Sequence, residues 1–69
     1  MTVDQARVAL ATPVGVPGSG RLRYGAAMTL WGAGVMRADM LECYRICAHL
    51  DGTDVGLVMQ DRGVTPQTP

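Results

Sequence analysis

Two stretches of helical pattern, separated by a short break at Gly34, constrain the fold of this chain more than any other feature. Residues 21–33 and 38–51 carry apolar side chains at the three- and four-residue spacing of an α-helix. A connection this short favours antiparallel neighbours, because other arrangements need a longer crossover. The sequence therefore predicts an all-α fold built on an antiparallel helical hairpin.

The joint of the hairpin has its own local chemistry. Gly34 can adopt the left-handed conformation just past the end of the first helix, and the next residue, Val35, should then pack back on Leu30. If Arg37 is the N-cap of the second helix, Met36 and Leu41 have the spacing of a hydrophobic staple. Arginine is a poor N-cap, because its side chain offers no acceptor.

The remaining segments are organised around the hairpin. Residues 1–12 should form a short N-terminal helix or docking segment, because Thr2 and Gln5 have the spacing of a capping box. The prolines and glycines of residues 13–20 indicate a linker. The hairpin domain then covers residues 21–62, and two prolines with no apolar pattern indicate a flexible tail. The tail is residues 63–69.

The segment 53–62 fits two structures. Val55, Val58 and Met59 suit a short third helix of the domain, while Val55, Leu57 and Met59 suit a strand. We favour the helix, because a single strand would leave its backbone donors unpaired.

Size and charge limit the partners. A chain of 69 residues forms one domain at most and has little core of its own, so a partner is a structural expectation. Six Arg, no Lys and six acidic residues give zero net charge, which does not favour nucleic acid. We interpret the absence of Lys as a compositional sign of a GC-rich bacterial genome. No run reaches the roughly 20 apolar residues of a membrane span, and the N-terminus lacks the pattern of a secretory signal, so we expect a cytoplasmic protein.

The second helix has more apolar surface than one neighbour can cover. The spacing of an a/d seam is followed by Met36, Met40, Cys43, Cys47 and Leu50, and further apolar residues widen it on both sides. We therefore predict an interface with another protein chain or a second copy. The predicted interface residues are Met28, Trp31, Met36, Met40, Leu41, Tyr44 and Cys47.

No motif specifies catalytic, metal or cofactor chemistry. Cys43 and Cys47 lie one helical turn apart, and we expect buried, reduced thiols, with a metal or redox site shared with a second copy or another subunit as the alternative. The glycine spacing of residues 15–20 is that of a phosphate-binding loop, but the required Lys and Ser or Thr are missing after it. We expect no cofactor.

These observations favour a small non-enzymatic accessory subunit or adaptor that acts through helix-mediated protein–protein contacts. A chain this small offers no convergent set of titratable groups for catalysis. A helix-turn-helix-like DNA-binding regulator is the alternative, because two helices joined at Gly34 have the right outline. The second helix would, however, present a mixed set of charges in place of a basic one.

Overall fold

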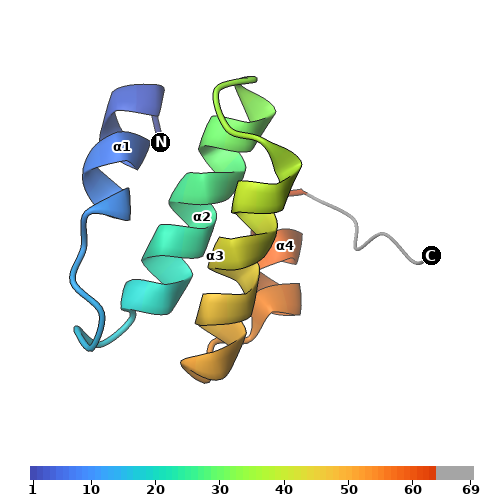
Figure 1. The fold of residues 1–69 in the computed structure, drawn as a ribbon. Coiled ribbons are helices and arrows are strands. Elements are labelled where there is room, and N and C mark those ends of the chain that lie inside the picture. Colours follow the sequence, from blue (N-terminus) through green and yellow to red (C-terminus); the bar gives the residue numbers. More distant parts are fainter. Residues whose placement is uncertain (64–69) are drawn as a thin grey trace.

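The computed structural model describes residues 1–63, which form four α-helices and no strand. The helices are α1 (Val3–Leu10), α2 (Ser19–Gly32), α3 (Ala38–Leu50) and α4 (Val55–Asp61). α2 lies in the middle, with α1 on one side and α3 and α4 on the other (Figure 1). The predicted all-α class and the antiparallel hairpin of α2 and α3 are confirmed. The predicted tail lies, apart from Gly63, outside the described residues.

The core consists of two clusters on opposite sides of α2. The first joins α1 to α2 through Ala6, Ala9, Ala26 and Leu30, and the second joins α2 to α3 and α4. The members of the second cluster are Tyr24, Met28, Ala48 and Val58, with Leu41, Tyr44, Val55 and Met59 at its edge. Small residues dominate the first cluster, so α1 can lie close to α2.

α1 begins with the predicted capping box. The backbone N–H of Gln5 donates to the Thr2 hydroxyl at 3.1 Å, and the backbone N–H of Thr2 donates to the Gln5 side chain at 2.8 Å. These reciprocal bonds satisfy donors that the first helical turn leaves free.

α2 begins two residues earlier than predicted. Ser19 and Gly20 belong to the helix and are buried, although the sequence assigns them to the linker. The N-cap is Gly18, whose φ of 78° is left-handed and which, as a glycine, has no side chain to accept a cap hydrogen bond. A helix start without a capping side chain gives no local sequence signal.

The joint after α2 is a Schellman motif, as predicted. Gly34 has a φ of 78°, and the backbone N–H groups of Gly34 and Val35 donate to the carbonyls of Trp31 and Leu30, both at 3.0 Å. The side chain of Val35 is 52% exposed. Met36 packs against the cluster that contains Leu30.

α3 begins at the predicted N-cap. Arg37 has extended backbone angles and makes no side-chain cap hydrogen bond. The guanidinium instead donates to Asp39 at 2.9 Å. The expected staple partners pack into different clusters, because Met36 joins the α1–α2 cluster and Leu41 joins the α2–α3–α4 cluster.

Arg37→Ser is expected to stabilise the fold by about 0.5–2 kcal/mol, because serine can accept a hydrogen bond from the free N–H groups of the first turn. Thermal unfolding followed by circular dichroism measures the gain. Ala38→Ser is the matched control, since it places the same side chain one residue inside the helix. A lower midpoint for Arg37→Ser would contradict a helix start at this residue.

The ambiguous segment 53–62 contains a helix, α4, and no strand. The backbone N–H of Thr53 donates to the carbonyl of Ala48 at 2.9 Å. This bond closes the end of α3 at Gly52 in a second Schellman motif. The carboxylate of Asp54 then accepts from the N–H of Leu57 at 3.0 Å and caps α4. No helix within residues 1–63 is both long and apolar enough to cross a membrane.

Candidate protein-interaction surface

α3 turns only a narrow face toward the rest of the protein. Ala48 is the one buried residue among its thirteen. A β-carbon placed on Gly20 would lie 3.4 Å from the Cα of Ala48, so α2 and α3 approach closely at this point. Leu41 and Tyr44 lie on the same side of α3 and cover the second core cluster. This contact fixes which side of α3 faces inward.

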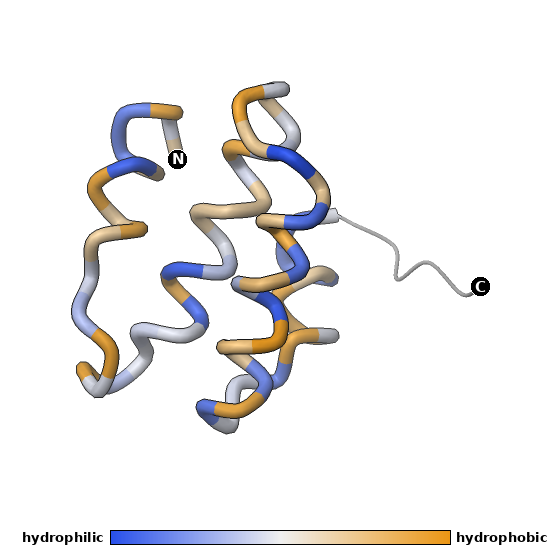
Figure 2. Tube along the Cα trace, in the orientation of Figure 1, coloured by the Kyte–Doolittle hydropathy of each residue, from blue (hydrophilic) through white to orange (hydrophobic). Residues whose placement is uncertain are grey.

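The opposite side of α3 carries a continuous strip of exposed apolar and thiol side chains, which we call the outer strip. It consists of Met40, Cys43, Ile46, Cys47 and Leu50. Met40 is 43% exposed, Ile46 45% and Leu50 80%, and both thiols are exposed. Apolar residues recur along the whole of α3 in Figure 2, although the helix buries one of them.

The structure divides the predicted interface residues into two groups. Met28 is buried, and Met36, Leu41 and Tyr44 are half-buried in the core clusters, so these four side chains serve the fold. Trp31, Met40 and Cys47 are exposed. Sequence reasoning did not select Cys43, Ile46 and Leu50 for the interface, although their spacing from Met40 and Cys47 places them on one helical face.

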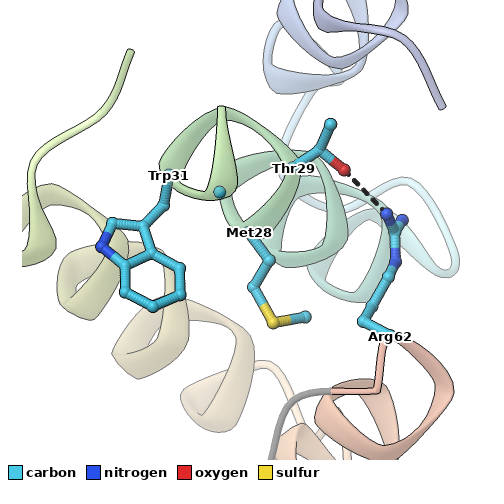
Figure 3. Close-up of a pocket in the computed structure, with 5 residues that line it drawn as sticks. Met28, Thr29, Trp31 and Arg62 are labelled. Carbon is cyan, nitrogen blue, oxygen red and sulfur yellow. Dashed lines mark hydrogen bonds between the residues drawn. The ribbon is translucent and has the colours of Figure 1, made fainter. Parts of the chain in front are cut away.

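Trp31 belongs to a different surface from the outer strip. It lines a shallow pocket of about 260 Å³ together with Met28, Thr29, Gly32 and Arg62, and no residue of α3 contributes. In this pocket the Arg62 guanidinium donates to the Thr29 hydroxyl at 2.8 Å (Figure 3). Trp31 and Met28 therefore do not extend the outer strip as the sequence suggested.

The cysteines are not core thiols. The prediction that Cys43 and Cys47 are buried is wrong, because both are exposed on the outer strip. The reason is the close contact of α2 with Ala48, which turns the opposite side of α3 outward. Within residues 1–63, no three His, Cys, Asp or Glu side chains gather closely enough to hold a metal ion.

On the polar side of α3, Glu42 and Arg45 form an ion pair within the helix. The Nε of Arg45 donates to the Glu42 carboxylate at 2.9 Å and 3.0 Å. This hydrogen bond lowers the pKa of Glu42 and raises the pKa of Arg45. Burial raises the pKa of nearby Tyr24, with Arg45 acting in the opposite direction. Both groups of the pair therefore stay charged near neutral pH.

Most arginines are likewise engaged with carboxylates. The ion pairs are Arg21–Asp61, Arg23–Asp51, Arg37–Asp39 and Arg45–Glu42. A DNA reader needs cations that are free to meet phosphates. The ion pairs therefore give no support to the DNA-binding alternative.

The glycine-rich start of α2 lies next to a negative charge. A β-carbon placed on Gly20 would lie 2.9 Å from the Asp51 carboxylate. A phosphate at this helix end would be repelled by that carboxylate, so the glycine spacing of residues 15–20 has a structural role.

The chain matches no protein-family model, and comparison with the curated proteins and with the solved structures found no match.

Proposed function

We propose that this protein is a small non-enzymatic adaptor or accessory subunit that binds another protein chain, or a second copy of itself, through the outer strip of α3. One observation carries the proposal: α3 buries a single residue inside the protein while five apolar or thiol side chains lie on its outward face. Single exposed apolar residues are normal, but a contiguous strip along one helix face marks an interaction site.

The outer strip leaves apolar surface of α3 uncovered. Met40, Ile46 and Leu50 keep between 43% and 80% of their surface in contact with water. Burying such surface against a partner is favourable by roughly 25 cal/mol for each Å² removed from water. Methionine also adapts readily to a partner's shape. A partner helix laid along α3 can cover the strip, as in other helix-mediated contacts.

The proposal includes the absence of catalysis and a cytoplasmic location. The pocket beside Trp31 contains one charged group, Arg62, and no set of titratable groups that converge on a substrate. The free thiols of Cys43 and Cys47 suit a compartment where cysteines stay reduced.

Ile46→Glu is expected to abolish association at micromolar concentration, because it places an unpaired charge in the contact. Sedimentation equilibrium of the wild-type protein should show a dimer, or a stable complex when the partner is present. Val8→Glu is the matched control, because Val8 is 75% exposed and lies on α1, which contacts α2 and not α3. It should leave association unchanged.

Met40→Glu should act like Ile46→Glu, since Met40 lies on the same strip and is 43% exposed. Tyr44→Glu is a less specific test, because Tyr44 is half-buried against the second core cluster and its replacement also affects folding. A well-folded monomer that captures no partner would refute the adaptor proposal.

A further inference from the structure

The two cysteines of the outer strip have the geometry of half a metal site. Cys43 and Cys47 are exposed and stand one turn apart on the same face of α3. Side chains at this spacing have Cβ atoms about 5–6 Å apart. That separation is too long for a disulfide, which needs about 3.5–4.5 Å. It suits a metal ion that bonds each sulfur at about 2.3 Å and holds the sulfurs on two corners of a tetrahedron.

One chain does not complete the site. No third His, Cys, Asp or Glu joins Cys43 and Cys47 in the described part of the chain. His49 follows Cys47 by two residues, which turns it about 200° around the helix and away from the strip. A tetrahedral site needs two further ligands from another molecule.

Four of the five members of the outer strip, all except Ile46, are placed symmetrically about Arg45 in the sequence. Cys43 and Cys47 lie two residues before and after it, and Met40 and Leu50 lie five residues before and after it. A second copy packed antiparallel along α3 therefore places its Cys47 opposite Cys43 and its Leu50 opposite Met40. This is the three-and-four spacing of a coiled-coil seam. The antiparallel direction also pairs opposite ends of the two helix dipoles.

We propose that two copies of this protein bind one Zn²⁺ at a two-fold interface of their outer strips, with Cys43 and Cys47 of each copy as the four ligands. This inference rests on the proposed function and names the second copy as the partner. On binding, each thiol releases its proton to solvent, and the metal forms a bond to each thiolate sulfur. No oxidant or reductant takes part. Met40, Ile46 and Leu50 surround the site and exclude water from it.

The test uses the full chain, purified under a metal-free reductant and loaded with Zn²⁺ or Co²⁺. Elemental analysis by mass spectrometry should find one metal ion for every two chains. Sedimentation equilibrium should show a dimer. Co²⁺ should show the strong visible absorption of a tetrahedral thiolate site. With Zn²⁺ at about 100 times its Kd, the dimer association constant should rise by about 100-fold relative to protein in the presence of a chelator.

Cys43→Ser and Cys47→Ser should each abolish the Co²⁺ absorption and the effect of Zn²⁺ on association. His49→Ala is the matched control and should change neither, because His49 lies off the strip. Circular dichroism of the metal-free variants checks that α3 remains helical. Because the cysteines are exposed, these serine variants should fold as the wild type does.

Four outcomes would overturn the metal proposal, and the last of them would overturn the proposed function as well. A dimer that forms equally well with chelator, and in the serine variants, would show association without metal and would leave the proposed function standing. One metal ion for each single chain would exclude the two-fold site, and a dimer that dissociates only in reductant would indicate intermolecular disulfides. A monomer that binds neither metal nor any partner would overturn both proposals together.

Discussion

Tyr24→Ala is expected to lower the free energy of unfolding by about 3–5 kcal/mol, the range for truncating a large buried aromatic side chain. Tyr24 is 1% exposed and belongs to the cluster that joins α2, α3 and α4. At 0.05–0.15 kcal/mol per residue, a chain of this size has a total stability of roughly 3–10 kcal/mol. The variant should therefore lose about a third or more of the stability of the fold, and a chain at the lower end of this range would be unfolded at room temperature.

Urea unfolding followed by circular dichroism measures this loss, and the chain offers a matched control. Tyr44 is the same residue type, packs at the edge of the same cluster and is half-buried. Tyr44→Ala should therefore cost clearly less than Tyr24→Ala. An equal or larger cost at Tyr44 would mean that the core lies elsewhere than between α2, α3 and α4.

The parts of this fold that the sequence predicted are those that local chemistry determines. The capping box at Thr2, the glycine end of α2 at Gly34 and the N-cap at Arg37 each depend on residues within one turn of one another. Local patterns of this kind can be read without knowledge of the tertiary structure. The start of α2 was placed too late because Gly18 caps the helix without a side chain.

The spacing of apolar residues along α3 does not determine which side of this helix faces the core. Both sides of this helix are apolar, so the pattern alone favours neither as the inner face. The choice is made by the close contact between Gly20 and Ala48 and by the need to cover Tyr24. The cysteines were therefore wrongly assigned to the core, and the exposed interface candidates were mixed with core residues.

Gly34 closes α2 before the chain turns into α3, and Gly34→Val should destabilise the fold by about 1–3 kcal/mol, the cost of holding a non-glycine residue in the left-handed region. Gly34 has a φ of 78°, and nothing lies within 4 Å of a β-carbon placed there. The expected loss therefore comes from backbone conformation and not from a clash. In a domain of this size, each kcal/mol lowers Tm by about 4–8 °C.

Gly32 provides a comparison in which the sign of the effect reverses. It is the last residue of α2, it lacks a positive φ, and a β-carbon there also meets nothing within 4 Å. Gly32→Ala should therefore raise Tm, because alanine favours a helix over glycine by up to about 1 kcal/mol. Gly34→Ala should lower it. If both alanine variants shift Tm in the same direction, Gly34 does not hold the left-handed conformation that closes α2, and the hairpin that directs the outer strip outward needs another explanation.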